Sequence, residues 1–366
     1  MKNKGFLSRY VTMAMVPIAF AALYWLFSRS TEMAEKGVAL FSRPARDFLG
    51  TLSSLIPISA AEILCAAGIL YVAVFLVRTV VQIFRGKFVE ILKRALILVL
   101  ICAYLGAGYL CLWGIDYRTR SFREREALGG GISKEELYKA AEIFVDRANA
   151  LADSVERGES GSFSGSAEEI LRLAPDVYGA VQARFSSLSG ALRAPKAMMF
   201  SDFMSATGFT GIFFPYTGES NVNVAQPAIF VPMTAAHELA HQLGVTDEDA
   251  CNAIGVSACV TSGDDTYRYS GYLNGSIYLL NALYAADSEK YAELRGRVTG
   301  SMARDFAENS AYWDSVRSSK PAQIATDAME QVYDAYLKAN GVESGFKSYG
   351  ECVDIIVKLY NEGFYK

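Results

Sequence analysis

Both histidines of the chain lie within one short motif. The 366 residues contain two His, and these are the first and last residues of His237-Glu238-Leu239-Ala240-His241. Residues four apart on a helix share one face, so two imidazoles at this spacing can hold a single metal ion. The Glu after the first His is placed to take a proton from a metal-bound water. We therefore expect zinc (Zn²⁺) held by His237 and His241, with Glu238 as general base; the simpler alternative is two histidines on an ordinary helix.

A third zinc ligand has to come from further along the chain, because a catalytic zinc uses three protein ligands and one water. Gly244 can end the helix in the left-handed conformation, and three acids follow directly. In one pattern, H-x-x-G-x-x-D, the ligand is Asp247 from a loop. In the other it is Glu248 on a second helix. We favour Glu248, because Asn252 lies one turn further on the same face and can hold the second ring nitrogen of a ligand His.

The acidic segment after Gly244 also has a simpler interpretation. Acidic residues are common in the first turn of any helix, so Asp247, Glu248 and Asp249 do not by themselves require a metal. Cys251 is an alternative ligand that we favour less than Glu248. The six cysteines of the chain are expected to be free thiols.

The elements before the motif have to position it. We expect the metal-binding helix to begin near Thr234, as an N-cap after Pro232, and to follow a strand over residues 228–231. Upstream, residues 210–216 and 221–231 have the pattern of a β-hairpin. A strand beside the helix could pair with an extended peptide. The aromatic residues that would line such a cleft, if they are not simply core residues, are Phe213, Phe214 and Tyr216.

The first third of the chain has the composition of a membrane anchor. The chain is 52% hydrophobic, and uncharged or nearly uncharged runs cover about residues 10–27, 63–84 and 95–114, each long enough to span a bilayer. A secretory signal peptide is the alternative for the first run, and buried core helices are the alternative for all three. We favour a membrane anchor over residues 1–117 and a metallopeptidase domain over residues 118–366.

Basic residues give a weak indication of orientation. The loop between the second and third runs holds four of them, and the N-terminal tail is also basic, which favours the cytoplasm for both. Arginines on the opposite side reduce this bias. The expected protein is a multi-pass protein of the cell membrane with an extracytoplasmic catalytic domain.

Beyond residue 117 the chain is polar and has the signals of helices. Ser133 with Glu136, and Ser166 with Glu169, are capping boxes that open helices towards residues 153 and 186. Six further helices are expected over about 248–260, 270–286, 288–297, 301–318, 322–340 and 348–362. The fold class is therefore mainly α: three transmembrane helices, then an α+β zincin-like domain with a small sheet beside the H-E-x-x-H helix and a helical C-terminal part.

Several segments together resemble a known family. They are GIFFPYTGESNVN, FVPMTAAHELAHQLG and EDACN within residues 211–252, with residues 48–64, WGIDY at 113–117 and YSGY at 269–272. They resemble bacterial multi-pass membrane proteins of unknown function that look like gluzincin-type zinc peptidases. The resemblance implies zinc ligands His237, His241 and Glu248, with Glu238 as base. Where the pattern E-D-E-A-N is expected, this chain has EDACN, so a shift of ligand to a neighbouring acid stays open.

The expected function is a membrane-anchored zinc peptidase that hydrolyses peptide bonds of a peptide or protein substrate at a lipid bilayer. Tyr269 and Tyr272 are candidate oxyanion donors, although packed tyrosines are more common. The alternative from another class is a non-catalytic membrane sensor or scaffold. An intramembrane protease is disfavoured, because acids follow the motif at once. The net charge of -4 argues against nucleic-acid binding, and the oligomeric state is open.

Overall fold

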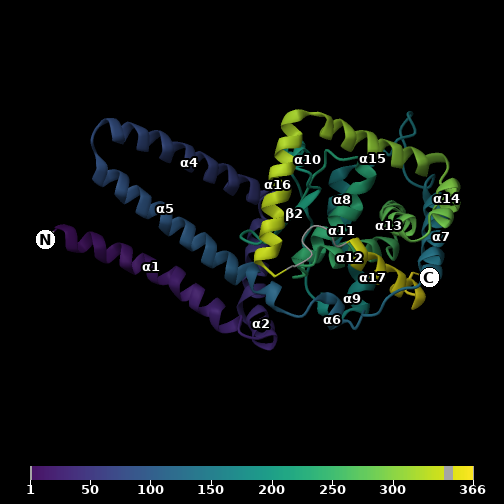
Figure 1. The fold of residues 1–366 in the computed structure, drawn as a ribbon, viewed down its shortest axis with the longest axis horizontal. Helices are drawn as coiled ribbons and strands as arrows, with labels where there is room; N and C mark the ends of the chain where they lie inside the picture. Colours follow the sequence, from purple (N-terminus) through teal and green to yellow (C-terminus); the bar gives the residue numbers. More distant parts are fainter. Residues whose placement is uncertain (1, 342–348, 366) are drawn as a thin grey trace. The chain divides into compact units, whose positions relative to one another are not determined.

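The computed structural model describes residues 2–341 and 349–365 and is mainly helical. The chain forms two compact units (Figure 1). The first consists of Met1–Arg120 together with the short segment Phe214–Gly218. The second consists of Ser121–Phe213 and Glu219–Lys366. The predicted start of the last helix, Ser348, lies outside the described residues.

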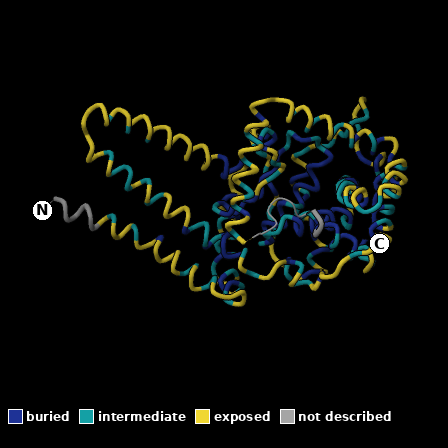
Figure 2. Tube along the Cα trace, in the orientation of Figure 1, coloured by how far each residue is buried: buried dark blue, intermediate teal, exposed yellow. Residues whose placement is uncertain are grey.

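The first unit contains three helices that are long and apolar enough to cross a membrane, as predicted. They cover Arg9–Phe27, Ala60–Phe84 and Phe88–Gly114. Figure 2 shows the second of these, α4 (Ala60–Phe84), exposed along almost its whole length, as a lipid-facing helix would be. The third helix starts before residue 95, where its uncharged run begins. The charged residues before that run are part of the helix and do not break it. The remaining elements are α1 (Lys2–Phe27), α2 (Thr31–Gly37), α3 (Arg43–Ser53), α5 (Phe88–Tyr109) and π-helical turns at Val38–Ser42 and Leu110–Gly114.

A buried ion pair joins α3 to the end of the third apolar helix. The Arg46 guanidinium donates to both carboxylate oxygens of Asp116, at 2.6 and 3.0 Å, and to the Leu112 carbonyl at 2.6 Å. It also lies 5.0 Å from the centre of the Trp113 ring. Removing one partner of such a pair would leave a buried charge, at a cost of about 3–5 kcal/mol.

The turn between β2 (Gly211–Phe214) and β3 (Glu219–Val222) belongs to the first unit. The Tyr216 hydroxyl donates to the carbonyl of Leu105 in α5. Gly218 has φ +62°, and a Cβ there would collide with the Arg46 carbonyl oxygen, so this position requires glycine. The hairpin predicted from the sequence is present, and its Tyr216 contacts the third apolar helix.

The second unit has a small sheet of strand order β1-β3-β2 among helices. The strand β1 (Lys196–Ala197) pairs in parallel with β3, and Lys196 lies opposite Asn221. The helices are α6 (Phe122–Arg125), α7 (Lys134–Leu151), α8 (Ala167–Leu173), α9 (Gly179–Arg184), α10 (Ser201–Ala206), α11 (Val231–Gln242), α12 (Glu248–Val260), α13 (Asp265–Ala286), α14 (Ser288–Arg297), α15 (Gly300–Ser318), α16 (Lys320–Ala339) and α17 (Tyr349–Asn361). The core includes α11 and α12, which are buried on nearly all sides.

The segment before the histidine motif differs from the prediction. Residues 228–231 do not form a strand: a 3₁₀ turn over Ala228–Phe230 leads directly into α11. Pro232 lies in the first helical turn, where a missing N–H costs nothing and the fixed φ favours the helix. Thr234 is therefore not the N-cap, and its hydroxyl donates to the Phe230 carbonyl at 3.1 Å.

The helix starts predicted at Ser133 and Ser166 are found in the structure, unlike the strand predicted over residues 228–231. The Ser133–Glu136 capping box is confirmed at the start of α7. Ser166 caps α8, but the helix expected to reach residue 186 is interrupted by a 3₁₀ turn over Ala174–Tyr178. Pro175 in that turn accounts for the interruption, since it has no N–H to donate.

The loop charges predict the orientation of the chain in the membrane. We expect single reporter cysteines at Gly86 and at Ser160, both exposed, to react with a membrane-impermeant maleimide from opposite sides. Ser160→Cys should label in intact cells and Gly86→Cys only after lysis. The parent chain, whose six cysteines lie in apolar helices or are buried, gives the background. Labelling of Gly86→Cys alone in intact cells would reverse the orientation.

Candidate metal centre

Two packed helices, α11 and α12, carry the predicted ligands. Gly244 has φ +91°, so it ends α11 in the left-handed conformation as predicted. Asp247 then caps α12 by accepting a hydrogen bond from the Asp249 N–H at 3.1 Å. A Cβ on Gly255 of α12 would lie 3.0 Å from the backbone nitrogen of His237. Glycine at this position therefore lets α12 approach α11 closely.

Three side-chain atoms converge between these helices. The Nε2 atom of His237 lies 3.2 Å from Nε2 of His241 and 3.1 Å from Oε2 of Glu248. The third separation, from His241 Nε2 to Glu248 Oε2, is 3.6 Å. A tetrahedral zinc with bonds of about 2.0–2.1 Å holds its ligand atoms about 3.3 Å apart. The three atoms are therefore spaced as ligands of one ion.

Hydrogen bonds on the other ring nitrogens leave both Nε2 lone pairs available. His241 Nδ1 lies 2.7 Å from the Val245 carbonyl, which can only accept, so Nδ1 carries the proton. His237 Nδ1 lies 2.9 Å from Oδ1 of Asn252, an atom that also accepts from the Tyr278 hydroxyl at 3.1 Å. These are the supports that orient metal-binding histidines in proteins. The structure thus places Asn252 where the sequence predicted it.

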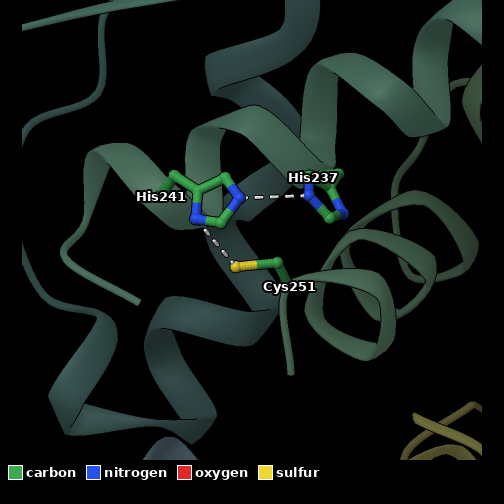
Figure 3. Close-up of side chains that lie close together, drawn as sticks. All are labelled: His237, His241 and Cys251. Atoms are coloured by element: carbon green, nitrogen blue, oxygen red, sulfur yellow. Dashed lines mark hydrogen bonds between the residues drawn. The ribbon is translucent and has the colours of Figure 1, made fainter. Parts of the chain in front are cut away.

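Cys251 forms a second possible ligand group with the two histidines, their ligand atoms all within 4.8 Å of one another. Figure 3 shows that the thiol and His237 approach different ring nitrogens of His241. The Sγ atom lies 3.4 Å from Nδ1 of His241, the nitrogen that donates to the Val245 carbonyl. Burial raises the pKa of the Cys251 thiol to about 12. A single ion between the two Nε2 atoms is therefore better served by Glu248 than by Cys251.

Glu238 is buried beside the histidines, with 3% of its surface exposed. Burial raises the pKa of its carboxyl to about 7, and the two histidines oppose a larger rise. Within the described part of the chain, its Oε2 atom has no hydrogen-bond partner. A Cβ on Gly211 in β2 would collide with Oε1, so this glycine makes room for the carboxylate. A buried carboxylate oxygen without a donor fits a site that is completed by a bound water or cation.

The two predicted oxyanion donors lie in other environments. The fully buried Tyr269 donates its hydroxyl to Asp305, which also pairs with Arg157. Tyr272 is buried against Phe144, with ring centres 5.1 Å apart. Tyr269 is therefore held in a separate polar cluster, and neither tyrosine has a described contact with the histidines.

A tyrosine that the sequence did not indicate contacts the site. The hydroxyl of Tyr333, in α16, donates to Oε1 of Glu248, 85 residues away in the chain. No local motif marks this residue. The sequence signal it does have is its place on the helix predicted over residues 322–340, which many tyrosines share.

Comparison with known proteins gives a family without an established function. Residues 40–357 match the family described as "Protein of unknown function (DUF3810)", and the chain belongs to this family. No curated protein and no solved structure matches the chain. The match covers the second and third apolar helices and the histidine motif, so these parts occur together in one family.

The convergence of the three atoms predicts how metal content responds to substitution. Purified protein should carry about one zinc per chain, and His237→Ala combined with His241→Ala should abolish it. Glu248→Ala should lower zinc affinity strongly, because it removes the third ligand. Metal content after dialysis, measured by mass spectrometry, checks this. Unchanged zinc in the double variant would contradict the site.

Two further variants decide between the alternative third ligands. Cys251→Ala should keep zinc, because its sulfur faces the other ring nitrogen of His241. Asp247→Ala should also keep zinc and lower the free energy of unfolding by about 1 kcal/mol, through loss of the cap of α12. If zinc is lost from one of these two variants and kept in Glu248→Ala, the residue replaced in that variant is the third ligand.

Proposed function

We propose that this chain is a membrane-anchored zinc peptidase of the gluzincin type. The observation that carries the proposal is the convergence of His237 Nε2, His241 Nε2 and Glu248 Oε2 at separations of 3.1–3.6 Å. Zincin-like architecture is part of the same proposal, supported by the position of the small sheet beside α11. The three apolar helices are compatible with anchoring in a bilayer, and the loop charges favour an extracytoplasmic site.

The residues of the site have separate roles in this proposal. His237, His241 and Glu248 hold the ion, while Asn252 and the Val245 carbonyl fix the imidazole rings. When bound, zinc polarises the scissile carbonyl and lowers the pKa of a water. Glu238 would serve as the general base, accepting a proton from the attacking water and donating it to the departing amine. Its unpartnered Oε2 suits this role, because no described hydrogen bond competes for the proton.

The strand next to Glu238 supports a peptide as the substrate. In the strand order β1-β3-β2, β2 is at the edge of the sheet, and its first residue, Gly211, is in contact range of the Glu238 carboxylate. An edge strand offers backbone N–H and C=O groups to an extended peptide. A peptide laid along β2 would bring one of its amide bonds to the general base, which supports peptide hydrolysis over hydrolysis of small soluble esters.

Replacement of the base separates an enzyme from a scaffold. Glu238→Gln keeps the size and polarity of the side chain and removes its proton-accepting function. It should leave zinc content unchanged and reduce peptide hydrolysis by about 10²–10⁴-fold. The assay uses a peptide library that the wild type cleaves. A cellular function that survives Glu238→Gln and fails in Glu248→Ala would favour the sensor or scaffold.

The close contact of β2 with the base gives a second test. In Gly211→Ala the new methyl group would collide with Oε1 of Glu238, so one of the two must move. We expect at least a tenfold loss of kcat, since a misplaced catalytic group costs on the order of 10²-fold, with zinc retained. Gly179→Ala is the matched control, because a Cβ there meets no atom within 4 Å. Equal activity of both variants would remove β2 from the active site.

A further inference from the structure

Tyr333 contacts the carboxylate of Glu248 on the side away from the histidines. Oε2 of Glu248 is the atom near both Nε2 atoms, at 3.1 and 3.6 Å. Oε1 instead accepts the hydrogen bond of the Tyr333 hydroxyl. The two oxygens of one carboxylate are thus assigned to different partners.

The Tyr333 ring is held by aromatic neighbours. Phe209 meets it edge-on with ring centres 5.5 Å apart, and Tyr336, one turn along α16, stacks on it at 5.8 Å. The Phe209 carbonyl accepts from the amide of Asn223 at 3.0 Å, which fixes this aromatic residue next to the sheet. Packing of the Tyr333 ring against these two neighbours therefore directs its hydroxyl at Glu248.

The helix that carries Tyr333 is attached at a second point. The Thr326 hydroxyl of α16 donates to the Ala206 carbonyl at the end of α10, at 3.0 Å. Most of α16 is otherwise exposed. Because few residues of this helix are buried, core packing alone does not account for a tyrosine directed at Glu248.

Resting on the function proposed above, we infer that Tyr333 is a positioning residue that keeps Glu248 a one-oxygen ligand. A donor on Oε1 disfavours its rotation towards the ion, so Oε2 alone binds. The ion then keeps three protein ligands and an open fourth position, as a catalytic zinc site requires. Without this hydroxyl the carboxylate, whose side chain is 36% exposed, is free to bind through both oxygens or to turn towards water.

The test compares two tyrosines of the same helix. Tyr333→Phe removes the hydroxyl and keeps the ring, and Tyr336→Phe is the matched control in the stacked pair. Zinc affinity is measured on the full-length, detergent-solubilised protein by competition with a chelator. The expected result is a 10–100-fold weaker affinity for Tyr333→Phe, as for other residues that support metal ligands, with Tyr336→Phe within about twofold of wild type by the same reasoning.

Cobalt substitution reports coordination directly. Four-coordinate Co²⁺ absorbs visible light more strongly than five-coordinate Co²⁺, so Tyr333→Phe should show weaker visible bands than wild type at full metal occupancy. The melting temperature of the metal-free protein should not change, which separates positioning from folding. Wild-type affinity with an unchanged cobalt spectrum in Tyr333→Phe would overturn the inference, and so would an equal loss in Tyr336→Phe. A wild type that binds neither zinc nor cobalt would overturn the proposed function itself.

Discussion

The close approach of α12 to α11 is the constraint on which the rest of the site depends. Gly255 permits it, because a side chain there would press on the backbone of His237. Because the helices are this close, Glu248 of α12 lies beside the Nε2 atoms. Asn252, one turn later, lies beside Nδ1 of His237. A shift of α12 would therefore displace the proposed ligand Glu248 and the support of His237 together. Since both helices are buried on nearly all sides, the surrounding core resists such a shift.

The burial of Glu238 is the second feature that packing imposes. Burying a carboxylate with one oxygen lacking a donor costs several kcal/mol relative to water, and the raised pKa of Glu238 expresses the same cost. Gly211 makes room for the group where a larger residue would exclude it. Such an arrangement destabilises the fold unless a cation or a bound water offsets the cost. The adjacent cluster of His237 Nε2, His241 Nε2 and Glu248 Oε2 is spaced to hold such a cation, so the proposed metal binding would offset the cost of burying Glu238.

The strand β2 connects the site to the membrane part of the chain through the backbone itself. Its first residue, Gly211, lies so close to Glu238 that a Cβ there would collide with the carboxylate, and after Phe213 the chain enters the first unit. There, the Tyr216 hydroxyl donates to the Leu105 carbonyl of the third apolar helix. The turn of the hairpin is thus held within the first unit. The family match likewise spans both parts of the chain.

The sequence by itself determined the features that depend on neighbours within a few residues. These are the three apolar helices, the capping box at Ser133, the start of α12 and the i, i+4 histidine pair, all set by helical periodicity and local hydrophobicity. It failed at residues 228–231, where Pro232 favoured a helix over the apolar pattern of a strand. Only the tertiary structure brought Oε2 of Glu248 within 3.1 Å of His237 Nε2, held Tyr269 on Asp305, and brought Tyr333 to Glu248 from 85 residues away. The physical reason is that a side chain's partners across the core depend on how distant helices pack, and no local spacing encodes that packing.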